Sequence, residues 1–104
     1  MIVCQFSCDK DNMLTGFRIT GHAGLADMGE DICCASVSSA VMMAANTITE
    51  VFRLDAEVVV EENEIRLMLR EDEQGLGDKL LLGLVIHLEN LKDEFAGHIK
   101  VKVG

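Results

Sequence analysis

The spacing of apolar residues in this chain changes at one segment, Gly21–Ser38, whose sequence is GHAGLADMGEDICCASVS. Before it, residues 2–8 alternate between apolar and polar side chains, as in a β-strand with one buried face. From Ile32, within the segment, to Phe52, apolar residues recur every three or four positions, as in an amphipathic helix. The segment therefore joins a strand to a helix, and it carries a histidine and two adjacent cysteines. A nucleophile and a base at such a junction suggest covalent chemistry.

The residues before this segment predict a β-hairpin. Residues 2–8 form its first strand, Asp9–Asn12 have turn chemistry, and Phe17–Thr20 resumes an extended pattern. Cys4 and Cys8 fall on the apolar face of the first strand. A thiol at such a position is expected to act as a small core residue.

The first helix is expected to follow Asp31, a good N-cap, and to continue to Phe52. Its predicted buried stripe consists of Cys33, Val37, Ala40, Val41, Ala44, Ile48, Val51 and Phe52. Between strand and helix, Ala23–Glu30 has no usable period and contains Gly24 and Gly29. We expect a mobile loop here, because glycine-rich loops beside reactive groups often act as lids.

Three more strand-like runs follow in the second half of the chain. Ala56–Val60 and Glu64–Arg70 predict a second hairpin, with its turn at Glu61–Asn63. His98–Val103 alternates as a final strand with its lysines outward.

A second long helix is predicted to begin at Glu71 or Asp72 and to run to about Phe95, with Gly97 as its stop. Its apolar stripe comprises Leu76, Leu80, Leu84, Leu88, Leu91 and Phe95. Further apolar residues widen this surface beyond the needs of a surface helix: Leu81, Leu82, Val85 and Ile86. We expect homodimerisation through this helix, because so short a chain has little material to cover both faces. The alternative is a helix sunk more deeply in its own core.

The predicted order of elements is ββαββαβ. It indicates an α/β sandwich, in which two long helices pack on a mixed sheet. The 104 residues suit one domain, covering residues 1–104, and leave little room for two.

The chain carries 18 acidic and 9 basic side chains, for a formal net charge of −9. This balance argues against direct contact with nucleic acid, which requires clustered Lys and Arg. An acidic surface would attract basic proteins and speed encounters with them. The acidity could equally serve only to keep the protein soluble.

The sequence predicts a cytoplasmic protein. Its N-terminal residues lack the pattern of a signal peptide, and the longest apolar run, Leu80–His87, is too short to span a bilayer. Four cysteines without a secretory signal point to a reducing compartment.

Two adjacent cysteines compete for the role of nucleophile, and helix geometry separates them. Cys33 lies on the predicted buried stripe, whereas Cys34 is rotated by about 100° onto its polar shoulder, in line with Ser38. If Asp31 caps the helix, Cys34 falls in the first turn, where unpaired N–H groups favour a thiolate. Cys34 is therefore the better candidate.

His22 ends the hairpin, and the loop after it is long enough to bring His22 and Cys34 within hydrogen-bond reach. Such a pair activates the thiol and later protonates the leaving amine. Asp31 could orient His22 or only cap the helix, and the cap explains its position with fewer assumptions. Ser38 could support the site or bond back to its own helix.

GHA, then five residues, then G-x-D-I-x-C-A-x-x-S resembles the signature of the ribosomal-processing cysteine protease family (Prp). The matching positions are Gly21, His22, Ala23, Gly29, Asp31, Ile32, Cys34, Ala35 and Ser38. The length and the ββαββαβ order fit that family from end to end. One departure is Cys33, where the family more usually has a branched aliphatic residue.

The resemblance implies a homodimeric cysteine endopeptidase without a cofactor, with His22 as base, Cys34 as nucleophile and a flexible loop nearby. The implied substrate is the short, hydrophobic N-terminal extension of large-subunit ribosomal protein 27, removed before or during ribosome assembly. The loop residues Leu25, Ala26 and Met28 could close over an aromatic side chain of this extension. Ala23, Gly24 and Gly29 would belong to the same substrate-binding loop.

Two other functions remain open at this point. The first is a thiolate metal site, formed by Cys4, Cys8, Cys33 or Cys34 with His22, although adjacent cysteines on a helix point their thiols in different directions. The second is a non-catalytic, ribosome-associated assembly module, because a fold alone does not prove activity.

Overall fold

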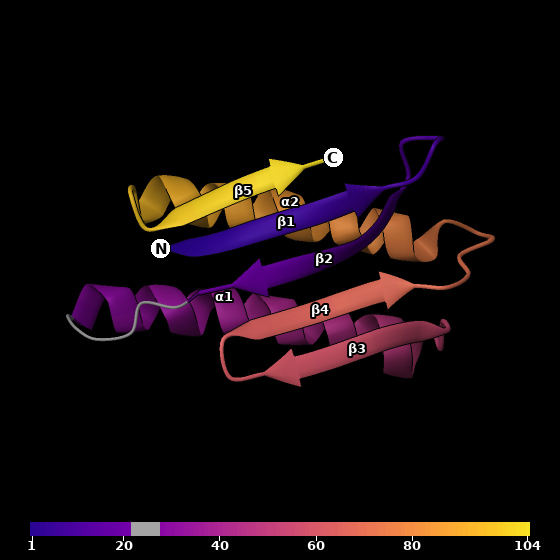
Figure 1. Ribbon diagram of the computed structural model, residues 1–104, viewed down its shortest axis with the longest axis horizontal. Coiled ribbons are helices and arrows are strands. Elements are labelled where there is room, and N and C mark those ends of the chain that lie inside the picture. The colour runs from indigo at the N-terminus through magenta and orange to yellow at the C-terminus, as the bar shows by residue number, and fades with distance from the viewer. Residues whose placement is uncertain (22–27) are drawn as a thin grey trace.

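The computed structural model describes the backbone of residues 1–21 and 28–104, and the side chains of the same ranges except 28–31 (Figure 1). The strands are β1 (Ile2–Cys8), β2 (Leu14–Thr20), β3 (Ala56–Glu61), β4 (Glu64–Leu69) and β5 (Ile99–Val103). The helices are α1 (Met28–Asn46), its π-helical continuation η1 (Thr47–Val51), and α2 (Leu76–Glu94). The predicted ββαββαβ order is confirmed.

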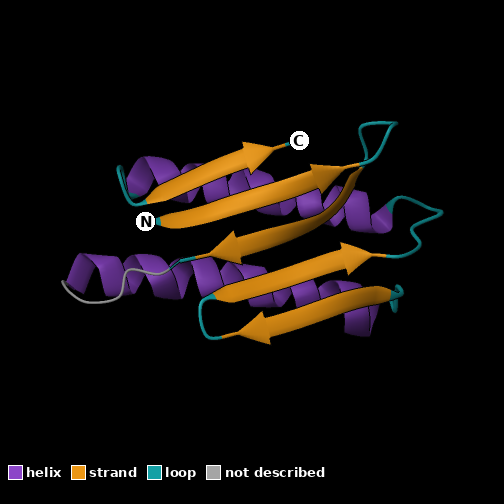
Figure 2. Ribbon diagram, viewed as in Figure 1, coloured by secondary structure: helices purple, strands orange, loops and turns teal. Residues whose placement is uncertain are grey.

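The strands form one mixed sheet in the order β3-β4-β2-β1-β5. Both hairpins are antiparallel, β2 also pairs antiparallel with β4, and β5 runs parallel to β1. Both helices cover the same face of this sheet, α1 behind the β4 and β3 side and α2 behind the β1 and β5 side (Figures 1 and 2). The molecule is therefore a two-layer sandwich whose second sheet face is open.

The core lies between the sheet and the helix layer. Alternation in β1 places Ile2, Cys4 and Phe6 in this core with exposed fractions of 3% or less. Phe6 packs against Phe17 of β2 at a ring-centroid distance of 6.1 Å. Burial raises the pKa of the Cys4 thiol to about 12, with smaller contributions from Cys33 and Glu89. The predicted core role of Cys4 is confirmed, because its thiol is held neutral among apolar neighbours.

The buried stripe of α1 follows the predicted spacing as far as Ile48 and then fails. Val51 is 69% exposed, although its spacing predicted a buried position. The reason is the π-helical turn, in which Phe52 donates its N–H to the carbonyl of Thr47, five residues earlier. The extra residue in that turn shifts the helical phase and rotates Val51 away from the sheet.

The stretch Ile32–Val51 is long and apolar enough to cross a membrane, with a mean hydropathy of 1.5. In the structure, however, its buried side chains contact the sheet: Cys33, Val37, Val41, Ala44 and Ile48 are at most 2% exposed. One third of the stretch is buried, and a core helix passes the same test of length and composition, so the finding is weak evidence for a membrane span.

The second helix begins later than predicted. The chain turns at residues 71–75, and α2 starts at Leu76 after Gly75, whose φ is +71°. The carboxylate of Asp72 accepts the N–H groups of Gly77 and Asp78, both at 3.0 Å. Asp72 thus satisfies the unpaired donors of the first turn from a position outside the helix. The predicted C-terminal end near Phe95 is confirmed.

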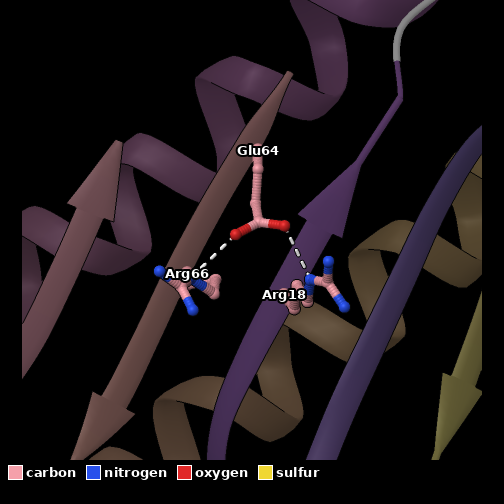
Figure 3. Close-up of polar contacts among 3 residues, drawn as sticks. All are labelled: Arg18, Glu64 and Arg66. Carbon is pink, nitrogen blue, oxygen red and sulfur yellow. Dashed lines mark hydrogen bonds and ion pairs between the residues drawn. The ribbon is translucent and has the colours of Figure 1, made fainter. Parts of the chain in front are cut away.

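The open face of the sheet carries charged side chains. Arg18 of β2 and Arg66 of β4 are directly paired in the strand register, which places like charges opposite each other. The Glu64 carboxylate lies between them: it accepts a hydrogen bond from Nε of Arg18 at 2.7 Å and forms an ion pair with Nε of Arg66 at 2.8 Å (Figure 3). One shared carboxylate therefore offsets the repulsion between the two guanidinium groups.

Candidate active site

The two adjacent cysteines of α1 lie in different environments. Cys33 is fully buried between α1 and the sheet, as the periodicity predicted. Cys34 is partly exposed and contributes to a pocket of about 130 Å³ at one end of the sheet. Because one residue of helix rotates the side chain by about 100°, only Cys34 reaches solvent from this position. The predicted division of roles between the core and the pocket is confirmed.

The pocket brings together residues from five parts of the chain. Its lining comprises Ile2, Ile19, Gly21, Cys34, Val37, Ser38, Val60, Glu61, Glu62, Asn63 and Ile65. Ser38, one helical turn after Cys34, is exposed and lies on the same wall. Of the predicted supporting residues, Gly21 and Ser38 are thus beside Cys34.

Gly21 fixes the direction in which the chain leaves β2. Its φ is +78°, and a Cβ at this position would lie 2.4 Å from the carbonyl oxygen of Met1. Its N–H donates to the carbonyl of Asn63 at 3.1 Å. Only glycine combines this left-handed conformation with so close an approach of the N-terminal backbone. The backbone leading to residue 22 therefore starts at the rim of the Cys34 pocket.

The start of α1 corrects two predictions. The helix begins at Met28, so Asp31 lies within it and is not its N-cap, and Met28–Glu30 are helical instead of part of the loop. Cys34 consequently lies beyond the four N–H groups that a helix leaves unpaired at its start. The predicted first-turn position, which would have favoured a thiolate at Cys34, is therefore wrong.

Several predicted site residues lie outside the described residues. These are His22 and the loop residues Ala23, Gly24, Leu25 and Ala26, together with the side chains of Met28 and Asp31 and the surroundings of Gly29. The pairing of His22 with Cys34 and the proposed loop closure remain predictions. The described part of the site consists of Cys34 and Ser38 on α1, Gly21 at the end of β2, and the turn between β3 and β4.

The turn Glu61–Asn63 is a part of the site that sequence reasoning missed. Its residues had been assigned only to a hairpin turn, yet they line the same pocket as Cys34. Their position depends on the pairing of β4 with β2, in which Glu64 lies opposite Thr20. This long-range register carries the turn to the end of β2 and has no local signal in the sequence.

Metal binding has little support in the described residues. Among them, no three His, Cys, Asp or Glu side chains are grouped so as to hold an ion. Cys4 and Cys33 belong to the core, whereas Cys8 and Cys34 line different pockets. The four cysteines are thiols.

A thiol in an accessible pocket is one half of the nucleophile–base pair that cysteine hydrolases use, and His22, the predicted base, lies outside the described residues. A family model described as "Cysteine protease Prp" matches residues 1–100. The chain belongs to this family, and it is a cysteine protease.

Individual proteins agree with this assignment. The chain is 23% identical to "Ribosomal processing cysteine protease Prp" of Bacillus subtilis, over 97% of this chain and 96% of that protein. Two crystal structures of an essential ribosomal processing protease Prp from S. aureus superpose over the full length of both chains. One, in complex with a substrate peptide, has a TM-score of 0.90 at 16% identity. The other, with a covalently linked product peptide, has a TM-score of 0.88 at 17% identity.

Proposed function

We propose that this protein is a cytoplasmic endopeptidase that processes a ribosomal protein, with Cys34 as nucleophile and His22 as general base. The observation that carries the proposal is the position of Cys34, whose side chain lines the pocket at the point where Gly21 leads to residue 22. His22, the histidine of the family signature, is thus the next residue in the sequence after Gly21, which lines the pocket.

The proposed reaction proceeds through a thioester. His22 takes the proton from the Cys34 thiol, and the sulfur attacks the scissile carbonyl carbon to form a tetrahedral oxyanion. Collapse of this intermediate breaks the C–N bond, while protonated His22 gives its proton to the leaving amine. Water, deprotonated by His22, then attacks the thioester carbonyl and releases the new carboxylate together with the Cys34 thiol.

The proposed substrate is the N-terminal extension of large-subunit ribosomal protein 27. Support comes from the family and from the name of the Bacillus subtilis relative, a ribosomal processing protease. The net charge of −9 also favours encounters with a basic ribosomal protein over contact with ribosomal RNA.

The proposed assembly is a homodimer through α2. Leu82 and Ile86 on its outer surface are 51% and 55% exposed. α1 and α2 also enclose a mostly apolar groove of about 710 Å³, whose lining includes Met43, Gly83 and His87. Exposed apolar side chains and an apolar groove on one helix layer are suited to a two-fold interface, in which the same surface of each copy contacts the other.

The test is mass spectrometry of the ribosomal protein precursor after incubation with wild-type protein, Cys34→Ala or Cys33→Val. The proposal expects cleavage by the wild type and Cys33→Val but not by Cys34→Ala. Cys33→Val is the matched control, because it changes the neighbouring thiol while keeping the buried position apolar. Equal cleavage by Cys34→Ala and wild type would overturn the assignment. Binding of the precursor without cleavage by any form would favour the alternative, a non-catalytic assembly module.

A further inference from the structure

The two edges of the sheet differ in how they are protected. Among the described residues, β3 pairs only with β4 and β5 only with β1, so both are edge strands. β5 carries Lys100 and Lys102, and lysines are a common protection of an edge against further pairing. β3 has the sequence AEVVVE, without lysine or proline, and its register with β4 continues without a bulge. It is therefore the edge that can accept another strand.

The side chains of β3 make this edge apolar on one face. Val58 is paired with the buried Leu67, which places Val58, and Val60 two residues later, on the helix-facing side of the sheet. These two valines are nevertheless 39% and 62% exposed. Glu57, Val59 and Glu61 alternate with them on the open side. An added strand would thus meet Val58 and Val60 on one face, and two carboxylates with one valine between them on the other.

The C-terminal end of β3 leads to the proposed nucleophile. Val60 and Glu61, its last two residues, line the pocket that contains Cys34. Figure 1 shows β3 as the outermost strand of its side of the sheet. A chain lying along β3 would therefore arrive at the Cys34 pocket at one end.

We propose that β3 binds the substrate by strand addition, so that an extended segment of the cleaved protein pairs with its outer edge and presents the scissile bond to Cys34. This inference rests on the proposed function. The six residues of β3 cover about 20 Å, enough for about six substrate residues. Backbone hydrogen bonds supply the affinity, and alternate substrate side chains contact Val58 and Val60.

The inference specifies a class of substrate. It must be an extended segment with a free backbone edge, because residues in a helix or in a central strand already use their N–H and C=O groups. Every second side chain faces Val58 and Val60 and should be apolar. The intervening side chains face Glu57, Val59 and Glu61, and those opposite the two carboxylates tolerate polar or basic groups. An N-terminal extension ahead of a folded domain meets the first requirement.

The primary test is a scan of the extension peptide in which one backbone amide at a time is N-methylated. Amides that point toward β3 lose a hydrogen bond and gain a clashing methyl group, whereas the amides between them point to solvent. We expect kcat/KM to fall about tenfold or more at every second position and to change little at the others. A uniform effect, or no effect, along the segment would exclude strand addition.

The matched variants are Val60→Lys on β3 and Val103→Lys on β5, whose valines are 62% and 52% exposed. Val60→Lys should raise KM about tenfold, since a charge on an edge opposes pairing, and Val103→Lys should not. A thermal unfolding midpoint close to that of the wild type establishes that each variant is folded. Equal changes in KM for the two variants would contradict the inference. If wild-type protein fails to cleave the unmodified peptide, the proposed function fails instead.

Discussion

At the scale of single residues, Gly21 is the position where backbone conformation and site geometry are most tightly linked. Gly21→Ala should lower the free energy of unfolding by about 1–3 kcal/mol, because alanine is strained at φ +78° and its Cβ meets Met1. It should also reduce kcat/KM at least tenfold, because residue 22 would leave the pocket rim in a different direction. Thermal unfolding and peptide cleavage measure the two effects.

The control for this variant is Gly97→Ala. Gly97 has a similar φ of +87°, but a Cβ there would meet no atom within 4 Å, and the residue is not among those that line the pocket. Gly97→Ala should therefore lose stability and retain kcat/KM. If Gly21→Ala also retained wild-type kcat/KM, the direction of the chain at Gly21 would not matter for catalysis.

The buried thiol of Cys4 makes stability depend on alkaline pH. Its pKa is raised from 9.0 to about 12, so the folded protein holds this proton more tightly than the unfolded chain. The resulting stability is fully present below pH 9 and is lost as the pH rises from 9 through 12. Urea unfolding of wild type should show a loss on the order of a few kcal/mol across this range. Cys4→Ala should show a smaller loss, and an identical pH profile for the two proteins would refute this account.

At the scale of secondary-structure elements, the order and type of every strand and helix could be predicted from the sequence, because residues 2–8 and 99–103 alternate and α1 and α2 have helical periodicity. The boundaries could not be predicted in the same way. Asp72 has the chemistry of a cap, but it contacts the helix from several residues upstream. The π-helical turn that exposes Val51 leaves no recognisable pattern in the sequence.

The turn between β3 and β4 is a part of the site whose position could not be predicted from local sequence. Cys34 could be distinguished from Cys33 by local helical phase, whereas Glu61 and Glu62 reach the pocket only through the register of β4 with β2.

The carboxylates of Glu61 and Glu62 should favour a basic residue near the scissile bond of the substrate. We expect wild-type protein to cleave a lysine-containing peptide several-fold faster than its glutamine analogue at low salt, with the difference shrinking at high salt.

The variant for this prediction is Glu61→Gln with Glu62→Gln, which should cleave both peptides at similar kcat/KM. Glu71→Gln with Glu73→Gln is the control, because it removes the same charge at a separate pocket. An undiminished preference for lysine in the first double variant would show that the turn does not select the substrate.

At the scale of the whole molecule, the two layers leave different surfaces uncovered. The open face of the sheet carries charged side chains, including the Arg18–Glu64–Arg66 cluster, and so can remain in water (Figure 3). The outer surface of the helix layer exposes Leu82, Ile86 and an apolar groove. Patches of this kind commonly mark protein interfaces. The sequence predicted that the second helix has more apolar residues than a surface helix needs, but it could not predict the groove, which depends on how α1 and α2 pack.

The proposed dimer can be tested through its two-fold symmetry, since one substitution enters such an interface twice. The chain has a mass of 11.4 kDa, and we expect twice this mass for wild-type protein in sedimentation equilibrium at micromolar concentrations. Ile86→Glu places two carboxylates in the apolar interface and should raise the dimer Kd about a hundredfold or more. Val51→Glu, at a residue 69% exposed on η1, should leave the mass unchanged. A monomeric wild type, or a dimer that withstands Ile86→Glu, would show that α2 does not form the interface.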